Sequence, residues 1–192
     1  MLGLPGEEEL VGNGISFCAV CDGAFYKDRT VAMAGGGNSA LQEVLLLAEN
    51  CKEVIVVQNL DFFTGEKRLV EAMQARPNVR TILGTVIDGY LQDENGLTGL
   101  KLRDTHTGET SDLPVDGLFV AVGLEPKNNA AFRDVAPLNE QGYFAADETC
   151  LTGRDGIYVA GDCRSKSIRQ LTTACADGAV AALAACRYLD LL

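Results

Sequence analysis

The sequence predicts an α/β protein with a three-layer domain built on a parallel sheet and an additional layer of antiparallel hairpins. Two near-continuous apolar runs, 30–34 and 53–57, flank a glycine-rich turn and a helical stretch, which is typical of parallel strands buried on both faces. From Val79 the pattern changes to short strands separated by turn residues. The stretch 168–192 is rich in alanine and predicts a long helix.

Composition limits the classes of partner. The 192 residues carry a formal net charge of -11, whereas nucleic acids and anionic membrane surfaces are bound by basic faces. The seven cysteines are odd in number and irregularly spaced, unlike a secreted disulfide framework. No signal peptide and no apolar run of membrane-spanning length is evident. We therefore expect a cytoplasmic protein that binds small molecules or proteins, and neither nucleic acid nor membrane.

The first chemical motif is the stretch Cys18-Ala19-Val20-Cys21-Asp22-Gly23, which follows a Gly, Pro and acid-rich connecting segment. Two thiols one helical turn apart at a helix N-terminus suit a reversible disulfide, because the helix dipole favours the thiolate that attacks disulfides. Half of a zinc site is an alternative, but the chain has one histidine, His106, and no second CxxC. We expect no metal. A pair of small buried residues stays open as a third interpretation. No histidine base lies near the pair, so Asp22 is the candidate proton carrier.

The second motif is the glycine-rich turn between the two apolar runs. Gly35, Gly37 and Ala40 fit the pattern GxGxxG/A, and 41–50 predicts the helix that follows. The first glycine allows the tight turn, the second allows close approach of a pyrophosphate, and the small third residue lets the helix pack on the strand. This strand–turn–helix–strand order predicts a Rossmann-like βαβ unit, although a glycine turn without a ligand is the alternative.

The remaining elements follow in order. The stretch 67–76 predicts a helix that stops before Pro77. We expect antiparallel strands over 79–87, 97–103 and a run ending at Leu113, with turns at 94–96 and 107–108. His106 lies in the second turn, where a solvated surface histidine is expected. A further buried strand, 116–123, is followed by the polar segment 124–129, where we place a domain boundary. The stretches 142–149 and 156–160 predict strands.

Taken together, these motifs resemble the bacterial thioredoxin reductases of the low-molecular-weight type, which are FAD- and NAD(P)-dependent pyridine nucleotide-disulfide oxidoreductases. The match covers nearly the whole chain, and it is specific in combination. The residues that carry it are 14–25, 35–40, 156–162, 169–171 and 177–179. The resemblance implies an NAD(P)-binding domain over 1–128, which carries the CxxC, and the C-terminal fragment of a split FAD-binding domain over 129–192.

The resemblance also implies an activity and roles. Electrons would pass from NAD(P)H to FAD, from the flavin to the disulfide, and from the dithiol to thioredoxin or a similar small thiol protein, in a homodimer. Cys21 would face the flavin, Cys18 would attack the substrate disulfide, and Asp22 would serve as acid and base. The cofactor-binding residues would be Gly35, Gly36, Gly37, Asn38, Ser39, Ala40, Val122, Gly123, Gly161, Asp162, Arg169, Gln170 and Leu171. The cysteines expected to pack are Cys51, Cys150, Cys163, Cys175 and Cys186.

The sequence departs from the family pattern in two places. The part of the FAD domain with the glycine fingerprint for the ADP half of FAD would precede residue 1, so we expect residues 1–192 alone to bind FAD weakly and turn over little. The family's His-Arg-Arg run and later arginine are replaced by Gln58-Asn59-Leu60 and Thr64. We therefore expect a weak preference for NADPH, or a preference for NADH. Two alternatives stay open: a homologue with another donor, such as ferredoxin, or another thiol substrate, and a non-enzymatic nucleotide-binding or thiol-relay module.

Overall fold

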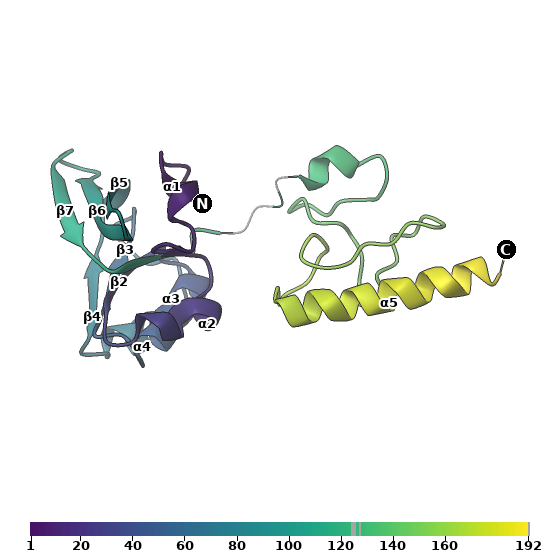
Figure 1. Cartoon of the computed structure of the whole chain (residues 1–192), viewed down its shortest axis with the longest axis horizontal. Helices are drawn as coiled ribbons and strands as arrows, with labels where there is room; N and C mark the ends of the chain where they lie inside the picture. The colour runs from purple at the N-terminus through teal and green to yellow at the C-terminus, as the bar shows by residue number, and fades with distance from the viewer. Residues whose placement is uncertain (124–125, 127, 192) are drawn as a thin grey trace. The chain divides into compact units, whose positions relative to one another are not determined.

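The computed structural model describes residues 1–123, 126 and 128–191, and these form two compact units, Met1–Gly123 and Leu124–Leu192 (Figure 1). The expected boundary segment 124–129 includes 124, 125 and 127, which lie outside the described residues, as does the expected helix end at 192. No helix in the described part of the chain is long and apolar enough to cross a membrane.

Unit 1 is built on a five-stranded sheet in which each neighbouring pair is parallel. In spatial order its strands are β1 (Ile15–Ser16), β8 (Gly117–Val120), β2 (Thr30–Ala34), β3 (Glu53–Val57) and β4 (Val79–Ile82). The helical segments of this unit are α1 (Glu7–Leu10), α2 (Ala19–Asp22), η1 (Gly23–Tyr26), α3 (Asn38–Leu47) and α4 (Lys67–Gln74). A three-stranded antiparallel sheet completes it: β5 (Thr85–Asp93), β6 (Gly96–Asp104) and β7 (Thr110–Pro114).

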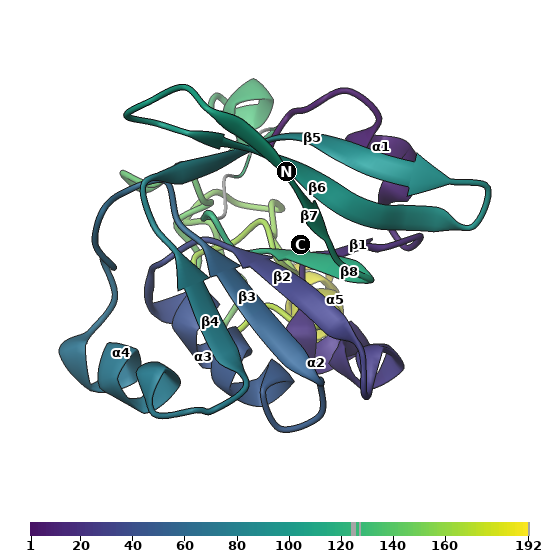
Figure 2. The same cartoon turned by 90° about the vertical axis from the view of Figure 1, so that its left-hand side faces the viewer.

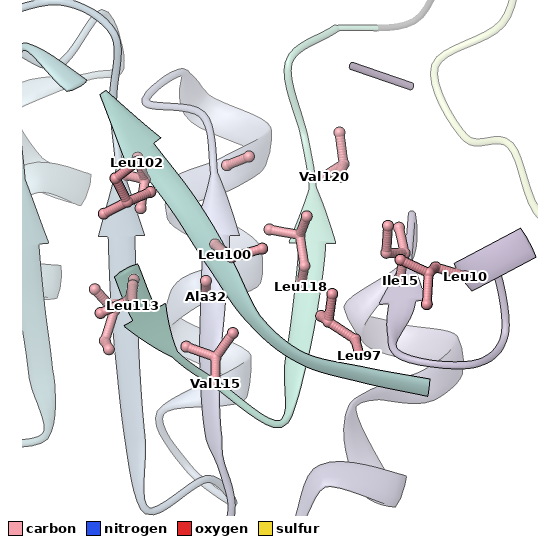
Figure 3. Close-up of a cluster of buried hydrophobic side chains, with 13 residues drawn as sticks. Leu10, Ile15, Ala32, Leu97, Leu100, Leu102, Leu113, Val115, Leu118 and Val120 are labelled. Carbon is pink, nitrogen blue, oxygen red and sulfur yellow. The ribbon is translucent and has the colours of Figure 1, made fainter. Parts of the chain in front are cut away.

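Strand β2 shows why the unit has three layers. Its residues alternate between the two faces of the sheet, since successive side chains of a strand point in opposite directions. Val31 and Met33 belong to the core cluster that contains the α3 side chains, whereas Ala32 and Ala34 belong to the cluster shared with β6 and β7. Figure 2 shows the antiparallel sheet over one face and the helices over the other, and Figure 3 shows the second cluster. The predicted α/β architecture with a hairpin layer is confirmed.

One expected strand is two strands with different partners. The run 79–87 was expected to pair antiparallel, but β4 pairs parallel with β3, and only β5 pairs antiparallel with β6. The chain changes sheets at Gly84, whose φ of 58° lies in the left-handed region that favours glycine. The residue pattern of 79–87 could not show this, because the partner of each half is set by tertiary pairing.

Unit 2 contains η2 (Asn129–Phe132), the long helix α5 (Leu171–Leu189) and irregular chain around a small core. The strands expected over 142–149 and 156–160 are wrong: the structure has only isolated bridges there, such as Leu151 with Tyr158. Positive φ values occur at Gly142 and Gly156, the first residue of each expected strand, and at Cys150 and Gly153 between them. Cys51 and Cys150 are buried as expected, but Cys175 and Cys186 are exposed, so their packing role is a wrong expectation.

Candidate dithiol and nucleotide site

Both motifs of unit 1 lie at one edge of the parallel sheet. Because the strands are parallel, their carboxyl ends meet at that edge, where Cys18 follows β1, Ala121 follows β8, Gly35 follows β2 and Gln58 follows β3. The strand order reverses at β2. The next strand along the chain, β3, lies on one side of β2, and the last strand of this sheet, β8, lies on the other. Open α/β sheets bind ligands at such a reversal, outside the carboxyl ends of the strands.

The CxxC pair is closed as a disulfide between Cys18 and Cys21, with Cα atoms 5.3 Å apart. Cys18 is the N-cap of α2, and its Sγ accepts a hydrogen bond from the Cys21 N–H at 3.2 Å. Cys21 is exposed, whereas Cys18 is partly buried. The described residues contain no group of three or more potential metal-ligating side chains. The geometry is that of a redox pair at a helix N-terminus, with the second cysteine at the surface.

A serine that the sequence analysis missed connects the acid to this pair. The buried Ser16 hydroxyl donates to Asp22 Oδ2 at 2.7 Å, and its oxygen accepts the Cys18 N–H at 3.1 Å. Ser16 is two residues before Cys18, and serine commonly bonds the N–H two residues later. That spacing was the available signal.

Two further groups shape the electrostatics around α2. The Glu43 carboxylate of α3 accepts the Ala19 N–H at 3.4 Å, directly behind the disulfide. Burial raises the pKa of Glu43, and this backbone hydrogen bond opposes the rise. Burial, and then the negative charge of Asp22, raise the pKa of Tyr26, whose ring packs edge-on against Phe119.

The glycine turn has the geometry that the motif predicts. Gly35 has φ +126°, and a Cβ there would lie 2.5 Å from the Ala121 carbonyl oxygen and 3.4 Å from the Cβ of Ala40. Gly37, the N-cap of α3, has extended backbone, and a Cβ there would meet only Thr64 Oγ1, at 3.6 Å. The first position is therefore restricted by the fold itself, whereas the space beside Gly37 is open to a ligand.

The segment after β3 is held against this turn. The Thr64 and Gly65 N–H groups both donate to the Gly36 carbonyl at 3.0 Å. Asn38 Oδ1 accepts the Glu66 N–H at 2.7 Å, and Asn38 Nδ2 donates to the Glu66 carboxylate at 3.1 Å. The side chain of Asn38, one of the predicted cofactor residues, is thus engaged with Glu66. Ser39 is exposed at the first turn of α3.

Gln58 is buried beneath the turn. A Cβ at Gly36 would lie 2.7 Å from the Gln58 side-chain carbon, and Gln58 Nε2 donates to the Phe62 carbonyl at 3.2 Å. The amide therefore supports the turn.

These residues fit a dinucleotide. The first turn of α3 has no side-chain cap at Gly37, so its N–H groups face the open space and would hold a pyrophosphate. Val122 is 52% exposed, and Gly123 has φ +115° with no atom within 4 Å of the position that a Cβ would take, which leaves the end of β8 open beside the turn.

In unit 2 the structure brings together two segments that the sequence predicted separately. Arg169 Nε donates to the Asp162 carbonyl at 3.2 Å, and the Arg169 guanidinium stacks 4.0 Å above the ring of Tyr143, which the sequence analysis missed. Leu171 at the start of α5 is 81% exposed. Gln170 is the N-cap of this helix, and its N–H donates to Thr173 Oγ1. Leu171 offers an exposed apolar side chain at the helix N-terminus, and Arg169 beside it is held in place. This arrangement fits contact with one part of a flavin.

A buried ionic cluster supports the Gly161–Asp162 segment from below. Asp177 accepts two bonds from Arg164 at 2.8 Å, one from Lys166 at 2.9 Å and one from the Gly161 N–H at 3.0 Å. These donors, Arg164 first, hold the pKa of Asp177 far below its usual range. Asp177 therefore fixes the left-handed turn at Gly161.

Comparison with known proteins agrees with this geometry. The family model described as pyridine nucleotide-disulphide oxidoreductase matches residues 1–178. The chain belongs to this family. It is 39% identical over 189 residues to a thioredoxin reductase of Listeria monocytogenes, covering 98% of this chain and 59% of that relative. A thioredoxin reductase of Treponema pallidum is 35% identical over 191 residues, with 61% of its length covered.

Among solved structures, the thioredoxin reductase from Streptococcus pyogenes superposes with a TM-score of 0.92 at 33% identity, over 100% of this chain and 62% of that chain. The chain thus spans about three fifths of the length of the relatives it matches. The Cys18–Cys21 disulfide and the glycine turn both lie within the matched residues.

Proposed function

We propose that this chain is the disulfide-carrying and pyridine nucleotide-binding part of a thioredoxin-disulfide reductase. The observation that carries the proposal is the Cys18–Cys21 disulfide at the same sheet edge as the glycine turn of Gly35. A reductase needs a dithiol that closes on itself, and the names of the relatives support thioredoxin as its partner. We further infer a cytoplasmic homodimer, which the family resemblance supports.

The proposed exchange has two steps. The Cys18 thiolate attacks one sulfur of the partner's disulfide, and a mixed disulfide forms while the partner's other sulfur leaves and takes a proton. Cys21 then attacks the Cys18 sulfur, which restores the internal disulfide and releases the partner's second thiolate. Two electrons pass from this chain to the partner. Asp22 accepts the proton of the attacking thiol and returns it to the leaving sulfur.

The cofactor residues are assigned by the same proposal. A flavin reduced by a pyridine nucleotide would supply, when bound, the two electrons that reopen the Cys18–Cys21 disulfide. Gly37 and the first turn of α3 would bind the dinucleotide pyrophosphate. Asp162, Arg169 and Leu171 would bind and orient the flavin.

The role of each cysteine can be tested by trapping. In Cys21→Ser, reduced Cys18 should form a stable mixed disulfide with oxidised thioredoxin, visible on a non-reducing gel and by mass spectrometry, because the resolving thiol is gone. Cys18→Ser should trap much less. The chain contains no tryptophan, so the fluorescence of a tryptophan-containing thioredoxin would report exchange with the unmodified protein. Equal trapping by both variants, or by neither, would contradict the assignment.

The electron donor is the second part of the proposal, and we propose NADH, or a weak discrimination between NADH and NADPH. Discrimination for NADPH needs cations on the 2′-phosphate, but Gln58, Asn59 and Leu60 are uncharged. The nearby cations already have carboxylate partners: Lys67 Nζ lies 3.5 Å from Glu71, and Arg68 Nε lies 2.8 Å from Glu66.

Titration of the protein with each nucleotide tests this proposal. Losing a hydrogen bond to a charged group costs about 1.5–3 kcal/mol, or roughly ten- to a hundredfold in affinity. We expect at most a weak preference for NADPH, or tighter binding of NADH. NADPH binding a hundredfold more tightly would overturn the proposal. Failure of both to bind would favour a different donor such as ferredoxin, the second candidate, which the loss of charge at Asn59 and Leu60 also favours.

A further inference from the structure

The Ser16 hydroxyl lies between two groups that the proposed exchange uses. Ser16 is 4% exposed and ends β1, where its backbone pairs in parallel register with Phe119 of β8. The hydroxyl donates its hydrogen to Asp22 at 2.7 Å, while its oxygen accepts the Cys18 N–H at 3.1 Å. Sheet pairing thus fixes the serine, and the serine in turn contacts both the acid and the backbone of the first cysteine.

We propose that Ser16 is a positioning residue that holds the Asp22 carboxylate beside the Cys18–Cys21 pair, so that the carboxylate controls how much thiolate the reduced pair contains. The inference rests on the proposed dithiol function. Asp22 directly follows Cys21 and lies one helical turn after Cys18, so its negative charge opposes formation of a second anion on either sulfur. The other titratable groups near α2 are Glu43, which accepts the Ala19 N–H, and Tyr26, and both are kept in every variant below. Without the hydroxyl, the Asp22 side chain would regain rotamer freedom, and its charge would lie farther from the sulfurs on average.

A purely structural role for Ser16 makes a different prediction. A serine that bonds the N–H two residues later forms a common turn, and such a turn would stabilise the start of α2 without acting on the thiols. In that case, removing the hydroxyl would lower stability and leave the pH dependence of thiol reactivity unchanged. The two roles therefore differ in one respect. In the proposed role, the effect of Ser16 on thiol reactivity requires Asp22, whereas in the structural role it does not.

The experiment measures alkylation of the reduced pair by iodoacetamide. The full chain is reduced with dithiothreitol, desalted and alkylated over the pH range in which thiols titrate. The first basic residue is Lys27, so trypsin releases residues 1–27, which contain Cys18 and Cys21 and none of the other five cysteines. Mass spectrometry of this peptide gives the rate for each site. The assay contains no thioredoxin. If thioredoxin proved not to be the partner, the result of this experiment would therefore be unaffected.

We expect Asp22→Asn to raise the alkylation rate at neutral pH by roughly three- to tenfold, because a nearby anion is removed. Ser16→Ala should change the rate in the same direction, and Ser16→Thr, which keeps a hydroxyl, should resemble the unmodified protein. The double variant should match Asp22→Asn alone. Ser111→Ala, on the exposed strand β7, is the control and should change nothing.

An unchanged pH profile in Ser16→Ala would overturn the inference. So would a Ser16→Ala effect that persists in full when Asp22→Asn is present, since it would then act through the backbone. If Ser16→Ala does not fold, Ser16→Val, whose β-branched side chain suits a strand, removes the same hydroxyl and permits the same comparison.

Discussion

Two glycines of one turn should respond oppositely to the same substitution. An alanine at Gly35 would hold an L side chain at φ +126°, which costs about 1–3 kcal/mol. Its Cβ would also lie 2.5 Å from the Ala121 carbonyl oxygen, a backbone atom that can move only with the strand end. Overpacking of this kind typically costs about 1–3 kcal/mol. The two effects together predict a loss of about 2–6 kcal/mol and a fall in Tm of roughly 4–24 °C.

Gly37→Ala should keep the fold. Its φ of -88° and ψ of 177° suit any residue, and the nearest atom to a Cβ is 3.6 Å away. Restricting the unfolded chain would then stabilise the protein by about 0.4–1 kcal/mol. The added methyl would occupy the space where a pyrophosphate approaches, so NADH affinity should fall tenfold or more, which corresponds to about 1.4 kcal/mol.

Thermal melts by circular dichroism and NADH fluorescence titrations measure both effects on the same samples. Gly35→Ala should lower Tm, whereas Gly37→Ala should keep or slightly raise Tm and weaken NADH binding. The reasoning would be refuted by a Gly37→Ala protein that binds NADH with unchanged affinity, or by a Gly35→Ala protein with unchanged Tm.

Two further predictions concern ionic contacts. Asp177→Asn should destabilise the protein by about 3–5 kcal/mol, because the buried Arg164 and Lys166 charges would lose their buried carboxylate partner. Glu148→Gln should cost about 0–1 kcal/mol, since this second partner of Arg164 is 86% exposed. Denaturant unfolding of both variants checks the two values, and equal losses would contradict the reasoning. Hydrogen bonding and charge from Asp61 raise the pKa of His106, so the stabilisation from this pair should be present below the ordinary histidine pKa and should be lost as pH rises through the raised value. His106 is the single histidine, so its one imidazole NMR resonance should titrate at lower pH in Asp61→Asn, and an unchanged midpoint would disprove the coupling.

The sequence alone predicted the features that depend on local patterns. The burial of β2 on both faces, the helix after the glycine turn and the closure of Cys18 on Cys21 each follow from patterns within a few residues. These features are decided by neighbours in the chain, so they can be inferred without the fold. The motif likewise predicted the tight turn at Gly35, but the contact that excludes a side chain there, with the Ala121 carbonyl oxygen, depends on the pairing of β2 with β8.

The tertiary structure decided which distant segments meet. Sequence spacing could not place Glu43 behind the CxxC helix, Tyr143 beneath Arg169, or Asp61 beside His106, because those pairs are brought together by packing of separate elements. The division of 79–87 between two sheets was missed for the same reason: a short strand can pair in either direction, and the packing of its neighbours decides which. Ordering the backbone costs conformational entropy, and only the whole set of contacts in the fold offsets that cost. No single stretch of sequence contains this set, so it cannot show which distant segments will pair.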